Sequence, residues 1–205
     1  LACGGYAVAI LVYILNKGQY SPLVRPAILT SALGYTLAGM GVALDVGRWW
    51  GLWKVPLFVW RWNVNSALLE IALCIMGYVV VLWIEVAPYL LERYKNGEHA
   101  TMRRVARAAI PALKRASIWI IALGLLLPTM HQSSLGTLML LANSRLHELW
   151  RTPLVPLFFL LTCVSMGYAV VVFESAFSAL GFKRKPETEM LAGLAGIIVP
   201  LQFFV

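Results

Sequence analysis

Six long apolar segments alternate with short polar segments along this chain. Windows of about 19 residues place them at residues 1–16, 26–47, 64–91, 117–142, 153–180 and 190–205. A helix rises about 1.5 Å per residue, so about 20 apolar residues cross a hydrocarbon core about 30 Å thick. The pattern therefore predicts an all-α, polytopic transmembrane helix bundle with about six spans. We expect residues 1–205 to form part of one membrane domain.

The composition excludes an ordinary soluble domain. The chain is 60% hydrophobic and 13% charged, whereas soluble domains average about 45–50% apolar and about 25% charged residues. It opens on Leu1 inside one apolar segment and stops at Val205 inside another. We therefore expect the first and last spans to be cut short, and the chain to be a fragment of a longer protein.

The basic residues predict which way the spans run. The chain has 17 Lys and Arg against 9 Asp and Glu, a net charge of +8. Most of these cations lie between apolar segments, which is typical of loops that set topology, so we expect no nucleic-acid partner. Twelve of the 17 lie on one side, in loops 17–25, 92–116 and 181–189. The positive-inside rule places these loops in the cytoplasm.

Two loops have a second interpretation. Loop 92–116 carries seven basic residues; we expect a solvated cytoplasmic connection, and an amphipathic surface helix is the alternative. The outer loop 48–63 is rich in tryptophan, with Trp49, Trp50, Trp53, Trp60 and Trp62. Tryptophan favours the headgroup level, so an interfacial belt is expected. A docking surface for a partner protein is the alternative, because aromatic residues and Arg dominate interface hot spots.

Ionisable residues inside spans are the best functional pointers in such a chain, because they are costly in lipid. In the second span a helical face of small residues leads to Asp45 and Arg48; its members are Ser31, Gly34, Ala38 and Gly41. Small residues let helices approach closely, so we expect this face, and Asp45 with it, to point into the bundle. The alternative is a stabilising pair between Asp45 and Arg48 at the helix end.

The third and fifth spans hold further acids. Ser66 and Glu70 are four residues apart, and Asn65 precedes them on the outer side. Glu85 and Glu174 lie in the cytoplasmic halves of their spans. These two acids form a possible proton route across the membrane, and the alternative is a pair of hydrogen-bonded structural groups.

The fourth span contains the most informative string, residues 127–136. Pro128 lacks an N–H, which leaves the carbonyl of Gly124 without its helical donor and predicts a kink. His131, Gln132, Ser133 and Ser134 follow directly, near the bilayer centre. Such a run is expensive unless neighbouring helices, water or a ligand satisfies it. We expect a polar cavity here; the alternative for His131 is a packing residue.

No metal site is predicted within this chain. Cys3, Cys74 and Cys163 lie in apolar segments without a CxxC motif, so neither zinc nor an iron–sulfur cluster is expected. Haem ligation by two histidines requires a second histidine inside the membrane, but His99 and His147 lie in loops. No haem is therefore expected, although Met40 and Met130 stay open as axial ligands.

Several strings together resemble the NrfD/polysulfide-reductase membrane-subunit family, most closely its HybB-type members, the so-called cytochrome b subunits of nickel–iron hydrogenase-2. The strings are Ala2-Cys3-Gly4-Gly5, Asn16-Lys17-Gly18-Gln19-Tyr20, Pro22-Leu23-Val24-Arg25-Pro26-Ala27, Asp45-Val46-Gly47-Arg48, Asn63-Val64-Asn65-Ser66 and residues 127–136. The resemblance implies a haem-free subunit that reacts with quinone as substrate. It also implies a periplasmic ferredoxin-like iron–sulfur partner and a catalytic subunit such as a nickel–iron hydrogenase, in the inner membrane of a bacterium or archaeon.

The residue patterns and the resemblance converge on a quinone pocket in the outer half of the membrane. Its expected members are Asp45, Arg48, Asn65, Glu70, His131, Gln132 and Ser133. His131 and Asp45 are the expected proton donors, because histidine and carboxylates relay protons. Three other functions stay open: a secondary transporter, for which a kinked helix with polar residues at the midplane is known, a proton-conducting membrane subunit, and a purely structural membrane anchor. Whether the subunit is an enzyme is left undecided, because it would not catalyse the reaction alone.

Overall fold

The computed structural model is a bundle of helices, and it describes residues 4–63, 65–95, 100–142, 145–182 and 188–204. Within these ranges there are helices and turns and no strand. The α-helices are α1 (Gly4–Ala9), α2 (Ser21–Asp45), α3 (Lys54–Leu57), α4 (Ala67–Tyr94), α5 (Ala100–Ala142), α6 (Val155–Phe182) and α7 (Thr188–Phe204). Short π and 3-10 turns are η1 (Ile10–Ile14), η2 (Gly18–Tyr20), η3 (Trp49–Gly51), η4 (Val59–Arg61) and η6 (Glu148–Trp150).

Four helices of the described chain are long and apolar enough to cross a membrane: Gly18–Asp45, Ala67–Tyr94, Thr101–Ala142 and Val155–Gly181. Two shorter apolar helices, Gly4–Ile14 and Thr188–Phe203, accompany them. Lipid offers no hydrogen bonds to the backbone, so a helix is the form in which a single segment can cross it. The expected all-α polytopic membrane bundle is confirmed.

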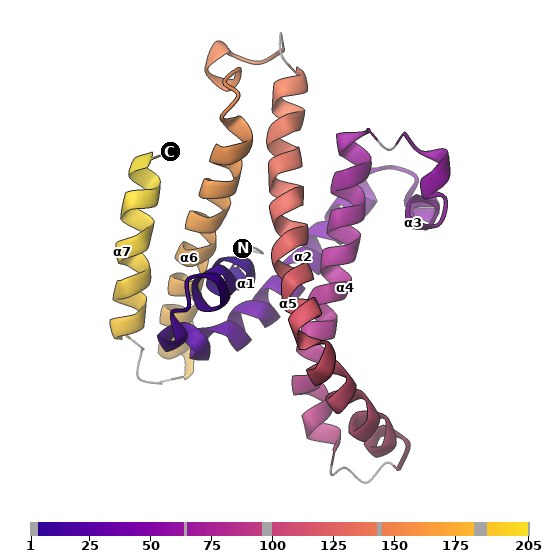
Figure 1. Cartoon of the computed structure of the whole chain (residues 1–205), viewed down its shortest axis with the longest axis vertical. Coiled ribbons are helices and arrows are strands. Elements are labelled where there is room, and N and C mark those ends of the chain that lie inside the picture. The colour runs from indigo at the N-terminus through magenta and orange to yellow at the C-terminus, as the bar shows by residue number, and fades with distance from the viewer. Residues whose placement is uncertain (1–3, 64, 96–99, 143–144, 183–187, 205) are drawn as a thin grey trace.

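Successive long helices run in opposite directions. In Figure 1 the N-terminal ends of α5 and α7 and the C-terminal ends of α4 and α6 lie at the bottom, and their other ends lie at the top. The loops predicted to be cytoplasmic adjoin these ends of the helices, so we call this end the cytoplasmic end below, in keeping with that prediction. We use "outer end" below for the opposite end.

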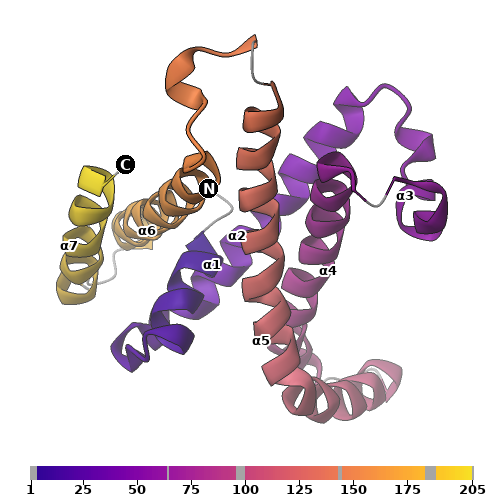
Figure 2. The same ribbon diagram turned by 45° about the horizontal axis from the view of Figure 1, so that its top comes forward.

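Residues 100–116, expected mainly as a solvated connection, form the first part of α5. Over 43 residues an α-helix is about 65 Å long, roughly twice a hydrocarbon core. Ala106 and Ile110 are buried in this part, while Arg103, Arg104 and Arg107 are exposed. The amphipathic helix, which was the alternative interpretation, is therefore the one that the structure contains, and it bends away from the upper part of α5 (Figure 2).

The core lies where α1, α2, α4, α6 and α7 meet, in the cytoplasmic half. It includes Leu11, Ala27, Leu82, Tyr168 and Leu194. The outer half of α2 departs from this core: Leu37, Met40 and Leu44 are exposed. Gly47 ends the helix, because its φ of +75° is a left-handed conformation that favours glycine. Arg48 consequently lies beyond the helix end and not on the face that contains Ser31.

Gly136 sets the distance between α5 and α6. A Cβ atom placed on Gly136 would lie 2.5 Å from the Cα and 2.9 Å from the nitrogen of Pro156. Both are backbone atoms, so a side chain there would force the two helices apart. Gly39 in α2 has no atom within 4 Å of the corresponding position.

We predict that Gly136→Ala lowers the free energy of unfolding by about 1–3 kcal/mol, because backbone atoms must move to accept the methyl group. Gly39→Ala is the matched control, and it should raise stability by up to about 1 kcal/mol through helix propensity. Both are measured by SDS-induced unfolding of the full-length protein in mixed micelles. Equal effects of the two substitutions would show that the α5–α6 contact does not depend on Gly136.

Candidate functional site

Polar side chains gather on the inner faces of α2, α4 and α5. The buried polar residues include Ser31 in α2 and His131 and Ser134 in α5. Tyr35 in α2 and Tyr78 in α4 are also buried. Because lipid cannot satisfy polar groups, these side chains define the part of the bundle in which chemistry can occur.

His131 is the residue of this group with an unmet hydrogen-bonding need. The residue is 8% exposed, and its Nδ1 atom has no hydrogen-bond partner among the residues that the structure describes. The ring packs against Tyr35 in an edge arrangement, with centroids 6.4 Å apart and planes at 67°. A buried ring nitrogen without a partner costs about 1–3 kcal/mol, so the position favours a water or a ligand that can pair with it.

Two tyrosines connect His131 to the cytoplasmic half of the bundle. Tyr35 packs edge-on against Tyr78, with ring centroids 4.7 Å apart and planes at 89°. Tyr78 in turn lines a small cavity between α1, α2, α4 and α5. Aromatic contacts therefore run without a break from His131 to this cavity.

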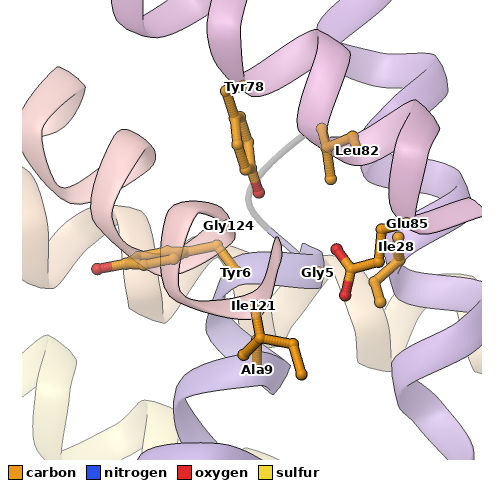
Figure 3. Close-up of a pocket in the computed structure, with 9 residues that line it drawn as sticks. All are labelled: Gly5, Tyr6, Ala9, Ile28, Tyr78, Leu82, Glu85, Ile121 and Gly124. Carbon is orange, nitrogen blue, oxygen red and sulfur yellow. The ribbon is translucent and has the colours of Figure 1, made fainter. Parts of the chain in front are cut away.

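The cavity is polar on one side. Figure 3 shows the hydroxyl of Tyr78 and the carboxylate of Glu85 pointing into the same space. The other lining residues are Gly5, Tyr6, Ala9, Ile28, Leu82, Ile121 and Gly124. Gly124, whose carbonyl cannot pair with Pro128 because proline has no N–H, belongs to the same lining. The cavity volume is about 10 Å³, which is about enough for one water molecule.

Two hydrogen bonds fix α1 against the rest of the cavity. The backbone N–H of Gly5, which lies in the first turn of α1 and has no partner within that helix, donates to Ser31 Oγ at 2.7 Å. The hydroxyl of Tyr6 donates to Thr129 Oγ1 at 2.7 Å, because the Thr129 hydroxyl itself donates to the carbonyl of Leu125. The cavity walls are therefore held by groups that would otherwise be unpaired in lipid.

The two inner acids have different surroundings. Glu85 lines the cavity. Glu174 in α6 accepts a hydrogen bond from the hydroxyl of Thr30 in α2. Glu174 therefore agrees with the interpretation as a hydrogen-bonded structural group. Glu85 lines the cavity and stays a candidate proton carrier.

The remaining predicted site residues are divided between the interior and the outer end. Gln132 and Ser133 flank His131 and are half-buried, and Ser133 Oγ donates to the carbonyl of Met130 at 2.9 Å. Glu70 is half-buried near the start of α4.

Asp45, Arg48 and Asn65 are exposed at the outer end. The expected burial of Asp45 is not observed, because the outer half of α2 diverges from the bundle. Asp45 and Arg48, both within the described chain, form no ion pair with each other.

Tyr6, Tyr35 and Tyr78 belong to the interior site, and the sequence analysis missed them. A signal was present, because Tyr35 comes four residues after Ser31 and Tyr78 four residues after Cys74, each on the face with small residues. Tyrosine is common at membrane interfaces, so the sequence pattern did not single out these three tyrosines as interior residues.

The family model "Polysulphide reductase, NrfD" matches residues 1–205, the whole chain. This chain belongs to the NrfD family. The resemblance inferred from the short strings is thereby confirmed.

Two named relatives are similar to this NrfD chain. The "Probable Ni/Fe-hydrogenase 2 b-type cytochrome subunit" of Escherichia coli (strain K12) is 45% identical over 185 residues, which are 89% of this chain and 44% of the relative. The "Menaquinone reductase, integral membrane subunit" of Nitratidesulfovibrio vulgaris is 30% identical over 140 residues, 66% of this chain and 31% of the relative. The chain thus spans less than half the length of either relative. No solved structure matches it.

The name of the first relative implies a b-type haem, and the described spans of this NrfD chain do not supply the two histidines that would hold one. His131 is the histidine within a described span; His147 lies in the outer segment before α6, and His99 lies outside the described residues. No group of three or more His, Cys, Asp or Glu in the described chain could hold a metal ion. Ligation by two histidines has no second imidazole here.

We predict that Ser31→Ala lowers the free energy of unfolding by about 1–3 kcal/mol, because it leaves the buried N–H of Gly5 without an acceptor. Thr162→Ala is a suitable control: its hydroxyl is exposed and bonds to carbonyls of its own helix. We expect the control to change stability by less than about 0.5 kcal/mol. Thermal unfolding of the full-length protein in detergent measures both, and equal losses would contradict the role of Ser31.

Proposed function

We propose that this chain is the quinone-reactive part of a membrane subunit in a multi-subunit oxidoreductase of the inner membrane of a bacterium or archaeon. The observation that carries the proposal is the unpaired, buried Nδ1 of His131 in the middle of a membrane helix. A relative of this chain is named as a membrane subunit of menaquinone reductase, which supports quinone as the substrate.

Quinone reduction adds two electrons and two protons and converts each carbonyl oxygen into a hydroxyl. In this proposal His131 hydrogen-bonds one carbonyl oxygen and passes a proton to it, because imidazole is an effective donor near neutral pH. Gln132 and Ser133 complete the polar lining beside it. In this proposal the electrons are delivered by the metal clusters of partner subunits.

The proposed partners are a periplasmic ferredoxin-like iron–sulfur subunit and a catalytic subunit such as a nickel–iron hydrogenase. The similarity to a subunit named for Ni/Fe-hydrogenase 2 supports the second. Asp45, Arg48 and Asn65 are exposed at the outer end, so in this proposal they guide the quinone or contact the iron–sulfur partner. Glu70 is half-buried in the first turn of α4, and in this proposal it lines the entry.

We further propose that protons reach His131 from the cytoplasmic side through the cavity at Glu85. His131 is seven residues from Gly124, about 10 Å along α5, and Tyr35 and Tyr78 occupy the interval. One water in the cavity would lie between the carboxylate of Glu85 and the hydroxyl of Tyr78. Carboxylates, hydroxyls and buried water are the usual components of proton relays in membranes.

His131→Gln should lower the rate of donor-dependent menaquinone reduction by about 100-fold, because the amide keeps a hydrogen-bond donor but cannot pass a proton at working pH. The rate is measured with the full-length complex in proteoliposomes. His147→Gln makes the same chemical change in an exposed loop and should retain the wild-type rate.

If the His131 variant assembles normally and turns over at the wild-type rate, His131 takes no part in the reaction. If Asp45→Asn is also silent, the membrane-anchor function is favoured over quinone chemistry. Substrate uptake without any electron donor would instead indicate a transporter.

Glu85→Gln should lower proton uptake from the cytoplasmic side, and with it the rate of quinone reduction, by about tenfold or more, because an amide does not relay protons. A pH-sensitive dye on that side of oriented proteoliposomes reports the uptake. Glu92→Gln is the matched control, since Glu92 is exposed at the cytoplasmic end of the same helix. Unchanged uptake in the Glu85 variant would exclude this route and leave the role of His131 to be judged by its own test.

A further inference from the structure

The outer segment between α2 and α4 carries positive charge where the positive-inside rule disfavours it. Residues 46–69 contain Arg48, Lys54 and Arg61 and no acidic residue. Neither Lys54 nor Arg61 forms an ion pair within the described chain. Cations on the outer side oppose the usual charge bias of membrane proteins, and an anionic ligand would pair with them.

Lys54 and Arg61 border a common pocket. Its lining residues are Lys54, Phe58, Arg61 and Trp62, and its volume is about 320 Å³. Each cation lies near an aromatic ring: Lys54 Nζ is 5.6 Å from the centroid of Trp53, and Arg61 Cζ is 5.7 Å from that of Phe58. The rings hold the two charges beside the pocket, through cation–π attraction.

A second, apolar pocket adjoins the first. It is lined by Val55, Trp62, Asn63, Ser66, Leu68, Leu69 and Ala72, and its volume is about 310 Å³. Trp62 borders both pockets. The first two turns of the membrane helix α4 contribute Leu68, Leu69 and Ala72 to this pocket. In a bilayer the pocket would therefore lead from the headgroup level into the hydrocarbon.

The segment lies at the side of α4 and does not project beyond the bundle. Figures 1 and 2 both show α3 beside the outer end of α4, on the outside of the bundle. Trp49, Trp50, Trp53 and Trp60 are exposed around it. Exposed tryptophans at the end of a membrane helix are typical of the headgroup region, where an amphipathic ring has both of its preferred environments.

We propose that this surface is a binding site for an anionic glycerophospholipid of the outer leaflet. The phosphate-bearing headgroup lies between Lys54 and Arg61, and an acyl chain lies along Val55, Leu69 and Ala72. A quinone is neutral, so it would form no ion pair with either cation. An acidic soluble partner would pair with the cations and leave the apolar pocket, which faces the bilayer, unfilled. A phospholipid matches both pockets with one molecule.

Quenching of tryptophan fluorescence by brominated lipids tests the site. The full-length protein is reconstituted in vesicles of dibrominated phosphatidylglycerol mixed with unbrominated phosphatidylcholine, and in the inverse mixture. Five of the 8 tryptophans of this chain lie at residues 49–62, so this segment contributes to the quenching, and the variants described next isolate its contribution. We expect the wild type to bind phosphatidylglycerol about tenfold more tightly than phosphatidylcholine at low salt.

The double variant Lys54→Gln/Arg61→Gln should lose this preference, to within about twofold of equal binding. Lys114→Gln/Arg115→Gln removes the same charge from exposed positions of α5 and should keep the preference. The exchange Lys54→Arg/Arg61→Lys preserves both charges and should also keep it, which separates loss of charge from misfolding. Glycerol 3-phosphate, which has no acyl chain, should not compete at the concentration of the lipid.

Three results would overturn the proposal. The first is a preference that persists in Lys54→Gln/Arg61→Gln. The second is effective competition by glycerol 3-phosphate, because the apolar pocket would then contribute nothing. The third is loss of a co-purifying protein subunit in that double variant with lipid preference unchanged, because the surface would then be a protein interface. None of these results bears on quinone turnover, which is tested separately through His131.

Discussion

The absence of water in the hydrocarbon core is the constraint on which this structure depends. Every backbone and side-chain polar group within the spans needs a partner inside the protein, because an unpaired group in lipid costs several kcal/mol. The hydrogen bonds between distant helices follow from this constraint. Gly5 with Ser31, Tyr6 with Thr129 and Thr30 with Glu174 each join two helices through groups that lipid could not satisfy.

Against this background the unsatisfied groups are informative. His131 Nδ1 has no hydrogen-bond partner within the described chain. The carbonyl of Gly124 has no i+4 donor, because Pro128 has no N–H. Both lie on α5, about two turns apart, and Tyr35 and Tyr78 connect their surroundings. Interiors that are otherwise fully paired tolerate such groups where a ligand or water completes them. The quinone site and the proton route proposed for this chain rest on that physical argument.

The outer end follows different rules, because headgroups and water supply both charge and hydrogen bonds. Asp45, Arg48, Lys54 and Arg61 can therefore be exposed there at little cost. The aromatic residues around them have the same explanation. Function at this end depends on charge and shape presented to lipids or partner proteins, and not on burial.

The sequence by itself determined the class of the protein and its helical segments, and it predicts their sidedness. Lengths of apolar segments and the distribution of Lys and Arg follow from the bilayer thickness and from membrane topology, and neither needs tertiary information. The six strings quoted in the sequence analysis together also identified the family. The sequence located His131, but it placed Asp45 in the bundle and overlooked Tyr35 and Tyr78. Which residues meet depends on how α2 crosses its neighbours and on where it leaves them. Close contacts such as Gly136 with Pro156 set the distances between helices, and they arise between residues that helical periodicity along one segment cannot relate.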